Sequence, residues 1–323
     1  CEGIAGNGGV LYNAPAGVVD VSGTTVRLGS CLVRIIVEAD DGTELSNVVQ
    51  ALEGGGLATQ NGGIIYNDGN MQLGGVGVYD GLAQVGGGIY NNGQLDIRNA
   101  LIRTSEALSG DGGGLYNTPN AANSQFTNVG FYDNAASGNG GGMYHSAGVN
   151  LLLHHGTFNQ NSASDGGGLY NLEDDFTINS NIFYANEATT GNNGAIQSVD
   201  HVTNNDVGLD YNNFFANTPN ESSIGTGSND ILEDPLLFGS VLLDVDSPVI
   251  DQADPSLVAA NPRFEIDLRA EPRPDGGPEN AGAEVSPYRS DIGAYEHIKR
   301  YACEIIPLDP DPVTVVAGSE QLY

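Results

Sequence analysis

The sequence is poor in several residue types, and each shortage narrows what the protein can be. It contains no tryptophan, two methionines and a single lysine, Lys299. Lysine and arginine together number 10 against 41 acidic residues, which gives a formal net charge of −31. Because no basic patch is available to neutralise phosphates, the composition argues against binding to nucleic acid or to anionic membrane surfaces. The same charge favours solubility and attracts cations.

Long hydrophobic runs are also missing. No segment reaches the roughly 18 apolar residues that a membrane helix needs, so we expect no membrane insertion. The chain starts at Cys1 rather than Met and shows no signal peptide, which we interpret as a processed, mature form. The other cysteines are Cys31 and Cys303, with no CxxC pair and no Cys/His spacing typical of zinc. Three is an odd number, so one thiol stays free or pairs with another chain.

Glycine, by contrast, is abundant at 47 of 323 residues, and much of it lies in a repeated hexad. The hexad GGGLYN occupies residues 112–117 and returns at residues 166–171. Close variants occur at residues 8–13, 62–67, 86–91 and 140–145. The tyrosine recurs about every 26 residues, which indicates an internal repeat.

Two further units follow from this period. The gap between Tyr12 and Tyr66 spans two periods, which predicts a degenerate unit at residues 33–38, VRIIVE. NNGAIQ at residues 192–197 predicts a last unit with Ile196 in the tyrosine position and Ala195 in the aliphatic position.

A second marker lies inside each unit, where an aromatic residue is followed three places on by asparagine. The pairs are Phe131/Asn134, Phe158/Asn161, Phe183/Asn186 and Phe214/Asn217, with Ile102/Ser105 as a weaker first member. The segments between are short, alternating and rich in β-formers, with turn residues every eight or so positions. Leucine-rich repeats need an LxxLxL pattern that is absent, and propeller blades need about 40 residues. The sequence therefore predicts an all-β, right-handed parallel β-helix of about nine or ten coils.

In such a stack, equivalent residues of successive coils form columns about 4.8 Å apart. We expect the glycines to make sharp turns, the aliphatic residue to point into the core and the tyrosine to lie outside. The Phe column should be buried. The amides should form two ladders of side-chain hydrogen bonds, the first interrupted by His145. The first includes Asn67, Asn91, Asn117 and Asn171, and the second consists of Asn134, Asn161, Asn186 and Asn217.

The paired motifs resemble the repeats of polymorphic outer-membrane proteins, which are surface-exposed β-helices. The segments EDPLLFG (233–239), SPVIDQAD (247–254), IDLRAEPRP (266–274) and DIGAYE (291–296) follow in order. This series resembles the end of bacterial choice-of-anchor domain proteins within the pectin-lyase-like superfamily. The resemblance covers nearly residues 1–297 and implies an extracellular or cell-surface location. It divides the chain into coils (1–230), a closing segment (231–298) and an extended tail (299–323).

Catalytic constellations are weak. Glu173, Asp174 and Asp175 are consecutive, so alternation turns Asp174 away from its neighbours, and Asp206 and Asp210 read as solvated turns. His154-His155-Gly156 superficially resembles a glycosidase signature without its partner motifs. Arg98 and Arg103 are the only basic residues between Arg34 and Arg263, and a lyase needs a basic residue. We predict no enzyme activity and no cofactor.

The charged residues of the closing segment have a structural interpretation. Asp267, Arg269, Arg273, Asp291 and Glu296 are expected to form a buried ion-pair set that locks this segment onto the last coil. Calcium at Asp267 or Asp291 is left open, because the ligand spacing matches no calcium motif.

Two non-catalytic functions stay open. A homopolymeric surface fibre is favoured because the repeat begins almost at once, without a capping helix. The tail then carries Val313, Val315 and Val316 in a strand-like segment that would pair with a neighbouring chain, or fold back on its own. Cys1 could bond Cys31 within the chain or Cys303 of the next subunit. The alternative is a monomeric adhesin that stacks carbohydrate on the outward tyrosines.

Overall fold

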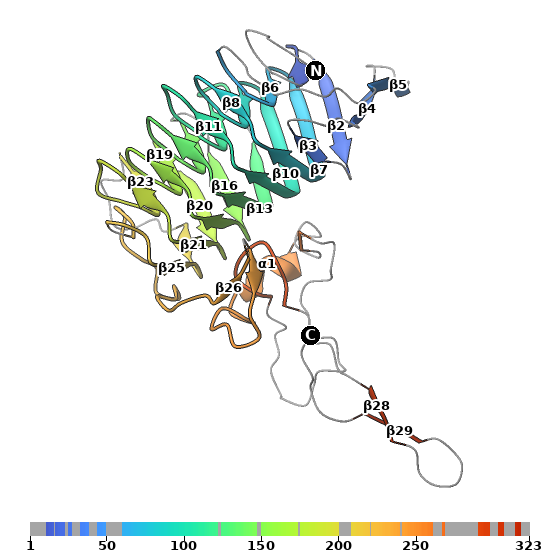
Figure 1. Cartoon of the computed structure of the whole chain (residues 1–323), viewed down its shortest axis with the longest axis vertical. Coiled ribbons are helices and arrows are strands. Elements are labelled where there is room, and N and C mark those ends of the chain that lie inside the picture. Colours follow the sequence, from blue (N-terminus) through green and yellow to red (C-terminus); the bar gives the residue numbers. More distant parts are fainter. Residues whose placement is uncertain are drawn as a thin grey trace.

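The protein is described by a computed structural model. The structure describes residues 11–15, 17–22, 25–27, 33–38, 44–49, 60–121, 124–146, 150–173, 175–199, 208–219, 221–239, 241–260, 267–268, 290–297, 303–306 and 314–317. The fold is a parallel β-helix, in which three stacked sheets run along one axis (Figure 1). The predicted fold class is therefore confirmed.

The first sheet is built from the hexads and has seven parallel strands. They are β1 (Leu11–Asn13), β6 (Ile65–Asn67), β9 (Ile89–Asn91), β12 (Leu115–Asn117), β15 (Met143–His145), β19 (Leu169–Asn171) and β23 (Ile196–Ser198). A parallel bridge from Ile196 to Ser222 continues it beyond β23. The described residues thus contribute seven strands to this sheet, somewhat fewer than the predicted nine or ten coils.

The second sheet has the longest strands of the coils. Its parallel members are β2 (Val18–Ser22), β3 (Thr25–Arg27), β7 (Asn70–Tyr79), β10 (Gln94–Arg103), β13 (Gln125–Tyr132), β16 (Leu151–His154), β17 (Thr157–Asn159), β20 (Phe176–Asn179), β21 (Ile182–Tyr184), β24 (Leu209–Asp210) and β25 (Asn213–Phe215). The third sheet is short and contains β8 (Leu82–Ala83), β11 (Glu106–Ala107), β14 (Ala135–Ala136), β18 (Ser162–Ala163) and β22 (Glu187–Ala188).

The structure corrects the unit predicted at residues 33–38. β1 pairs directly with β6, Leu11 opposite Ile65, so the 54 residues between their tyrosines make one coil step. The segment VRIIVE is strand β4 (Val33–Glu38), which forms an antiparallel pair with β5 (Glu44–Val49) and one antiparallel bridge to β2. It lacks the turn glycines and the amide of the hexad, so it does not take a place in the column.

A second correction concerns the register of the last hexad. Leu169 lies opposite Ile196, Tyr170 opposite Gln197 and Asn171 opposite Ser198. Ile196 therefore takes the aliphatic position and not the tyrosine position, and it is fully buried. The coil is one residue longer than the period predicted, and Ala195, also buried, lies one place before it.

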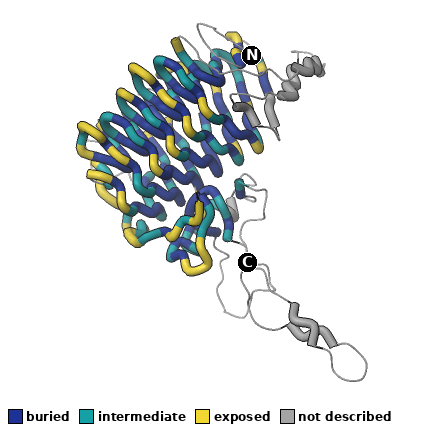
Figure 2. The backbone as a smooth tube through the Cα atoms, viewed as in Figure 1, coloured by how far each residue is buried: buried dark blue, intermediate teal, exposed yellow. Residues whose placement is uncertain are grey.

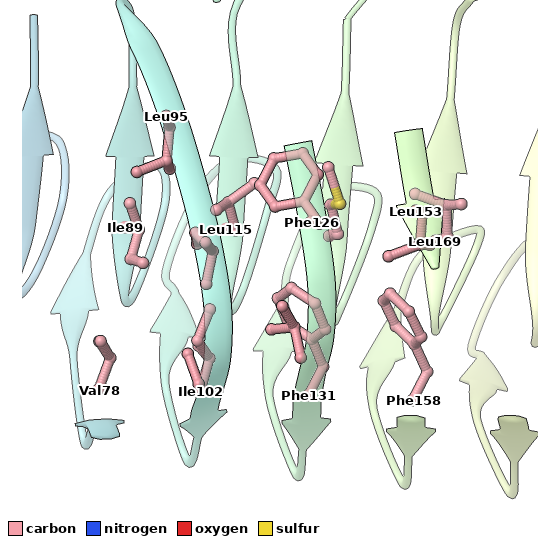
Figure 3. Close-up of a cluster of buried hydrophobic side chains, with 14 of the residues drawn as sticks. Val78, Ile89, Leu95, Ile102, Leu115, Phe126, Phe131, Leu153, Phe158 and Leu169 are labelled. Atoms are coloured by element: carbon pink, nitrogen blue, oxygen red, sulfur yellow. The ribbon is translucent and has the colours of Figure 1, made fainter. Parts of the chain in front are cut away.

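The core lies between the sheets, as Figure 3 shows for side chains contributed by the first and second sheets. The aliphatic positions are buried in every coil: Leu11, Ile65, Ile89, Leu115, Met143, Leu169 and Ile196. Phe131, Phe158, Phe183 and Phe214 form a buried column with ring centroids 4.6, 4.8 and 5.2 Å apart, as predicted. Figure 2 shows the buried chain in the interior of the stack and the exposed residues at its turns.

The hexad glycines are needed for two different reasons. In the five hexads between residues 62 and 171, the first glycine has a left-handed backbone, with φ of +71° at Gly112 and +59° at Gly166. The second touches the next coil, because a Cβ on Gly113 would lie 2.4 Å from the carbonyl oxygens of Ala135 and Gly141. Both requirements recur in each coil, which explains why the motif is repeated.

The C-terminal part contains a helix and two hairpins. Helix α1 spans Pro255–Ala260, and β26 (Leu237–Phe238) pairs antiparallel with β27 (Leu242–Leu243). Val249, Ala253 and Ile292 pack on Ile182 of β21, so this part leans on the side of the stack. In the tail, β28 (Cys303–Ile306) pairs antiparallel with β29 (Thr314–Ala317), and Figure 1 shows this hairpin away from the coils.

Candidate functional site

Six tyrosines form a stacked column on the outer face of the first sheet. They are Tyr12, Tyr66, Tyr90, Tyr116, Tyr144 and Tyr170. Neighbouring ring centroids lie 4.8–5.4 Å apart, with interplanar angles of 4–19°. The column exists because each tyrosine follows a buried aliphatic residue, and successive strand residues point to opposite faces.

Stacking decides what this column offers to solvent. The ring faces cover one another, so ring edges and hydroxyls line the surface. Tyr144 in the middle is 9% exposed, whereas Tyr12 at the end is 50% exposed. A sugar stacks on the face of an aromatic ring, and the stack leaves such a face only at its ends.

Burial also changes the acid–base chemistry of the column. It raises the pKa of Tyr66, Tyr90, Tyr116 and Tyr144 above the ordinary value of tyrosine. The negative charge of Asp68 raises the pKa of the first two further, and that of Asp111 acts on Tyr116 and Tyr144. Burial therefore favours the neutral form of these four tyrosines.

The first amide ladder runs beneath the tyrosines. The Nδ2 of Asn13 donates to Oδ1 of Asn67 at 2.7 Å, Asn67 donates to Asn91 at 2.7 Å, and Asn91 donates to Asn117 at 2.6 Å. His145 takes the place of the next amide, and Asn117 Nδ2 lies 3.0 Å from its Nδ1. An amide NH₂ can only donate, so His145 accepts at Nδ1 and carries its proton on Nε2. Asn171 then bonds the carbonyl oxygen of Glu173 at 2.7 Å.

The second ladder is denser. Oδ1 of Asn161 accepts from the backbone N–H and from Nδ2 of Asn134, at 3.1 and 2.9 Å. Asn186 and Asn217 repeat this double contact one and two coils further on. Each Nδ2 also reaches a backbone carbonyl, as from Asn161 to Phe131 at 3.0 Å. Before each asparagine stands a residue with left-handed backbone, such as Asp133 (φ 53°) and Gln160 (φ 56°).

Sequence reasoning missed a third ladder at a neighbouring corner. Asn181 accepts from the N–H of Gly156 at 2.6 Å, Asn212 accepts from the N–H of Asn181 at 2.9 Å, and Asp230 accepts from the N–H of Asn212 at 2.7 Å. The signal was present, because Ile178 precedes Asn181 by three places, as Phe158 precedes Asn161. Burial raises the pKa of the Asp230 carboxyl, and its bonds to the backbone N–H groups of Asn212 and Gly227 oppose this.

The candidate acids are not gathered into one site among the described residues. Glu173 and Asp175 are at the end of one coil, while Asp210 accepts from the side chain of Asn229 at 2.8 Å, and Asp174 and Asp206 lie outside the described residues. Arg98 and Arg103 are both engaged on β10. Arg98 pairs with Asp96 at 3.0 Å, and the guanidinium of Arg103 lies 4.3 Å from the ring centre of Tyr79.

One histidine of the pair, His155, makes a buried contact with the backbone of the closing segment. His155 is fully buried with a left-handed backbone, and its Nδ1 lies 3.3 Å from the carbonyl oxygen of Asp291. Asp291 accepts from the N–H of Asp251 at 2.7 Å, and Glu296 accepts from the N–H of Asp291 at 3.1 Å. Asp267 accepts from the N–H of Glu296 at 2.9 Å. These carboxylates bond backbone N–H groups, and their predicted partners Arg269 and Arg273 lie outside the described residues.

Only some of the residues predicted for assembly lie in the described part of the chain. Val315 lies opposite Ile305 and Val316 opposite Glu304, so the strand predicted in the tail pairs with β28 of its own chain. Cys303 begins β28. Cys1, Cys31 and Val313 lie outside the described residues.

Within the described part of the chain, no group of three or more His, Cys, Asp or Glu side chains is arranged to hold a metal ion. Among those same residues, no helix has the length and apolar character to cross a membrane. No family model, no curated protein and no solved structure matches the chain.

Proposed function

We propose that this chain is a non-catalytic extracellular structural protein, a rigid solenoid subunit that joins other copies end to end into a surface fibre. The proposal rests on the structure of the first coil. Among the described residues β1 is paired on one side only, with β6, and its Tyr12 ends the stacked column half exposed. A strand edge with an unsatisfied hydrogen-bonding row, next to an open aromatic face, favours continuation by another chain.

The hairpin of β4 and β5 restricts where such a joint forms. β4 contacts the free side of β2 through the bridge between Asp20 and Ile36, so part of the second sheet is covered at that end. The joint therefore centres on β1 and the tyrosine column. The tail contributes as a hairpin, whose strand β29 has β28 on one side and its other edge available for pairing in trans.

The type of repeat is also part of this proposal. Stacked glycine hexads and Phe-x-x-Asn corners support a repeat of the polymorphic outer-membrane protein and choice-of-anchor type, within the pectin-lyase-like superfamily. Proteins of that kind are displayed outside the cell. The contact between Asp291 and the buried His155 is consistent with a segment that closes the coils.

A monomeric adhesin that binds surface carbohydrate is the second candidate. It is favoured by the row of tyrosine hydroxyls on one face. It ranks below the fibre because the rings cover each other's faces at 4.8–5.4 Å and leave Tyr12 as the accessible platform. A polysaccharide lyase or hydrolase ranks last, because its candidate acids are dispersed and Arg98 and Arg103 are both engaged.

Electron microscopy of the purified full-length chain tests the fibre. We expect filaments whose length grows with protein concentration, and a chain ending at Ile298 that forms fewer of them. Non-reducing electrophoresis then tells whether Cys303 joins subunits covalently. Single particles at every concentration, together with binding of soluble polysaccharide that is lost in Tyr12→Ala, would favour the adhesin instead.

A further inference from the structure

An exposed apolar patch lies in the closing segment, separate from the tyrosine column. Four exposed hydrophobic side chains fall within residues 232–245, and we call them the 232–245 patch. They are Leu232 (57% exposed), Leu236 (38%), Phe238 (71%) and Val245 (38%). Phe238 is the most exposed large hydrophobic side chain in the described part of the chain. Monomeric proteins rarely leave such side chains clustered unless the surface binds something.

The patch sits on a rigid support. In the β26–β27 hairpin, Phe238 lies opposite Leu242, while Leu237 and Leu243 pack against the small core of Val249, Ala253 and Ile292. The hairpin is therefore anchored by one face and presents Phe238 on the other. An aromatic side chain held in this way loses little conformational freedom when it is buried in a partner's pocket.

The backbone at the base of the hairpin is held in an unusual conformation. Leu236 has a φ of 50°, a left-handed value that disfavours side chains with a Cβ. Its N–H donates to Oδ1 of Asp234 at 2.9 Å, and its carbonyl oxygen accepts from the N–H of Asp244 at 2.9 Å. Because both backbone groups are bonded, the exposure of Leu236 is part of the fold rather than a frayed end.

Along the chain, the stretch that contains the patch carries charge of one sign. Residues 208–260 contain no lysine, arginine or histidine. Their acidic residues are Asp210, Glu221, Asp230, Glu233, Asp234, Asp244, Asp246, Asp251 and Asp254. Four of these, Glu233, Asp234, Asp244 and Asp246, adjoin the patch in sequence and are exposed or half-buried.

We propose that the 232–245 patch is the docking surface for a partner protein whose contact surface has an apolar centre surrounded by lysine and arginine. The apolar side chains supply the buried centre and the carboxylates supply a complementary rim. A second copy of this chain is the poorer occupant, because its charge of −31 repels the same rim. The proposal is independent of the end-to-end assembly, which uses β1 and the tail.

The experiment uses the full chain and a synthetic amphipathic peptide of leucine and lysine, with an all-lysine peptide of equal charge as its control. Fluorescence anisotropy should show that the leucine–lysine peptide binds more tightly than the control. Phe238→Ser should weaken this binding at least tenfold. The matched variant Leu108→Ser, which removes another exposed hydrophobic side chain, one that lies on the coils, should leave it unchanged. Added salt should weaken binding, since the rim is charged.

Hydrogen exchange locates the contact. We expect new protection in residues 236–245 and none along the coils. Equal binding of the two peptides, or binding unchanged by Phe238→Ser, would mean that dispersed acids alone attract the peptide, and the proposal would be wrong. Sedimentation of the chain alone, in both forms, checks the remaining occupant: self-association that Phe238→Ser abolishes would assign the patch to a second copy and also overturn the proposal.

Discussion

At the scale of single residues, asparagine holds the coils together. Asn161 shows why: its Oδ1 accepts twice from Asn134, while its Nδ2 donates to Asn186 and to the carbonyl oxygen of Phe131. A buried side chain must satisfy both its donor and its acceptor, and no other side chain of this size offers both in this geometry. The left-handed residue before it turns the chain so that the amide points inward.

Replacing Asn161 with aspartate tests the donor half of this arrangement. In Asn161→Asp an oxygen would face two acceptors, so we expect a loss of about 3 kcal/mol or more in the free energy of unfolding at neutral pH. Burial and the facing oxygens raise the pKa of the new carboxyl in the folded state. Its protonated form is then favoured by folding, so part of the lost stability returns as the pH falls through that pKa.

Denaturant unfolding between neutral and acidic pH provides the measurement. Asn161→Ala is the matched variant, since it removes the Nδ2 donor, together with the Oδ1 acceptor, without adding a titrating group. A pH dependence that is the same in the two variants would contradict the assignment of the Nδ2 contacts.

Two glycines of the coils offer a contrast in sterics. Gly113→Ala places a Cβ 2.4 Å from two backbone carbonyl oxygens. Ordinary overpacking costs about 1–3 kcal/mol, and we expect this variant to lose more than that in its free energy of unfolding. Gly74→Ala meets no atom within 4 Å and should stabilise the fold by about 0.4–1 kcal/mol, because it restricts the unfolded chain. Thermal unfolding of both variants measures the difference, and equal effects would show that coil contact is not what selects glycine at the hexad.

At the scale of elements, the short strands of the first sheet are important because their side chains stack on those of the neighbouring coils. In β1, β6, β9, β12 and β19 the three residues go one each to the aliphatic core, the tyrosine column and the amide ladder. Stacking makes neighbouring strands depend on each other, since every ring and every amide contacts its equivalent in the next coil. The column is thus a property of the whole sheet, including its response to pH.

Alkaline titration should reveal this coupling. Burial raises the pKa of Tyr66, Tyr90, Tyr116 and Tyr144 in the folded chain, whereas unfolded tyrosine ionises at about 10. The stabilisation of the neutral form is complete below pH about 10 and is lost as the pH rises through the folded values. We expect tyrosinate absorbance to appear late and together with loss of the β-sheet signal in circular dichroism.

Phenylalanine provides the control for this titration. Tyr116→Phe with Tyr144→Phe keeps the stacked rings and removes two ionising groups, so the double variant should withstand a higher pH. If it unfolds at the same pH as the parent chain, ionisation of the column is not the cause of alkaline unfolding.

At the scale of the whole molecule, charge opposes the proposed assembly. A chain with a net charge of −31 repels its own copies, and the repulsion acts over about 10 Å at 0.1 M salt. We therefore predict that end-to-end assembly is suppressed at low ionic strength and increases with added sodium chloride. Light scattering across a salt series measures it, and assembly that decreases with salt would indicate that charge pairs, rather than the β1 edge and the tyrosine column, drive the contact.

The coil itself could be predicted closely from sequence, because each repeated position meets its own equivalent one coil away. The inward Leu115, the outward Tyr116 and the laddered Asn134 all follow from spacing and strand alternation. The third ladder could also have been predicted from sequence, since Ile178 and Asn181 have the same spacing as Phe158 and Asn161. The period predicts the wrong register where a coil changes length. At Ile196 the coil is one residue longer, so the spacing no longer predicts which residues pair.

The sequence by itself thus determined the parallel β-helix, its core and its ladders, since these are contacts between members of one repeating pattern. Only the tertiary structure decided the parts without a period. Strands β4 and β5 pair antiparallel instead of forming a coil, Asp291 contacts the buried His155, and Phe238 is presented to solvent by a hairpin anchored on its other face. Such contacts join segments that are far apart in the chain. The spacing of residues within one segment does not predict which surface of the other segment it will contact.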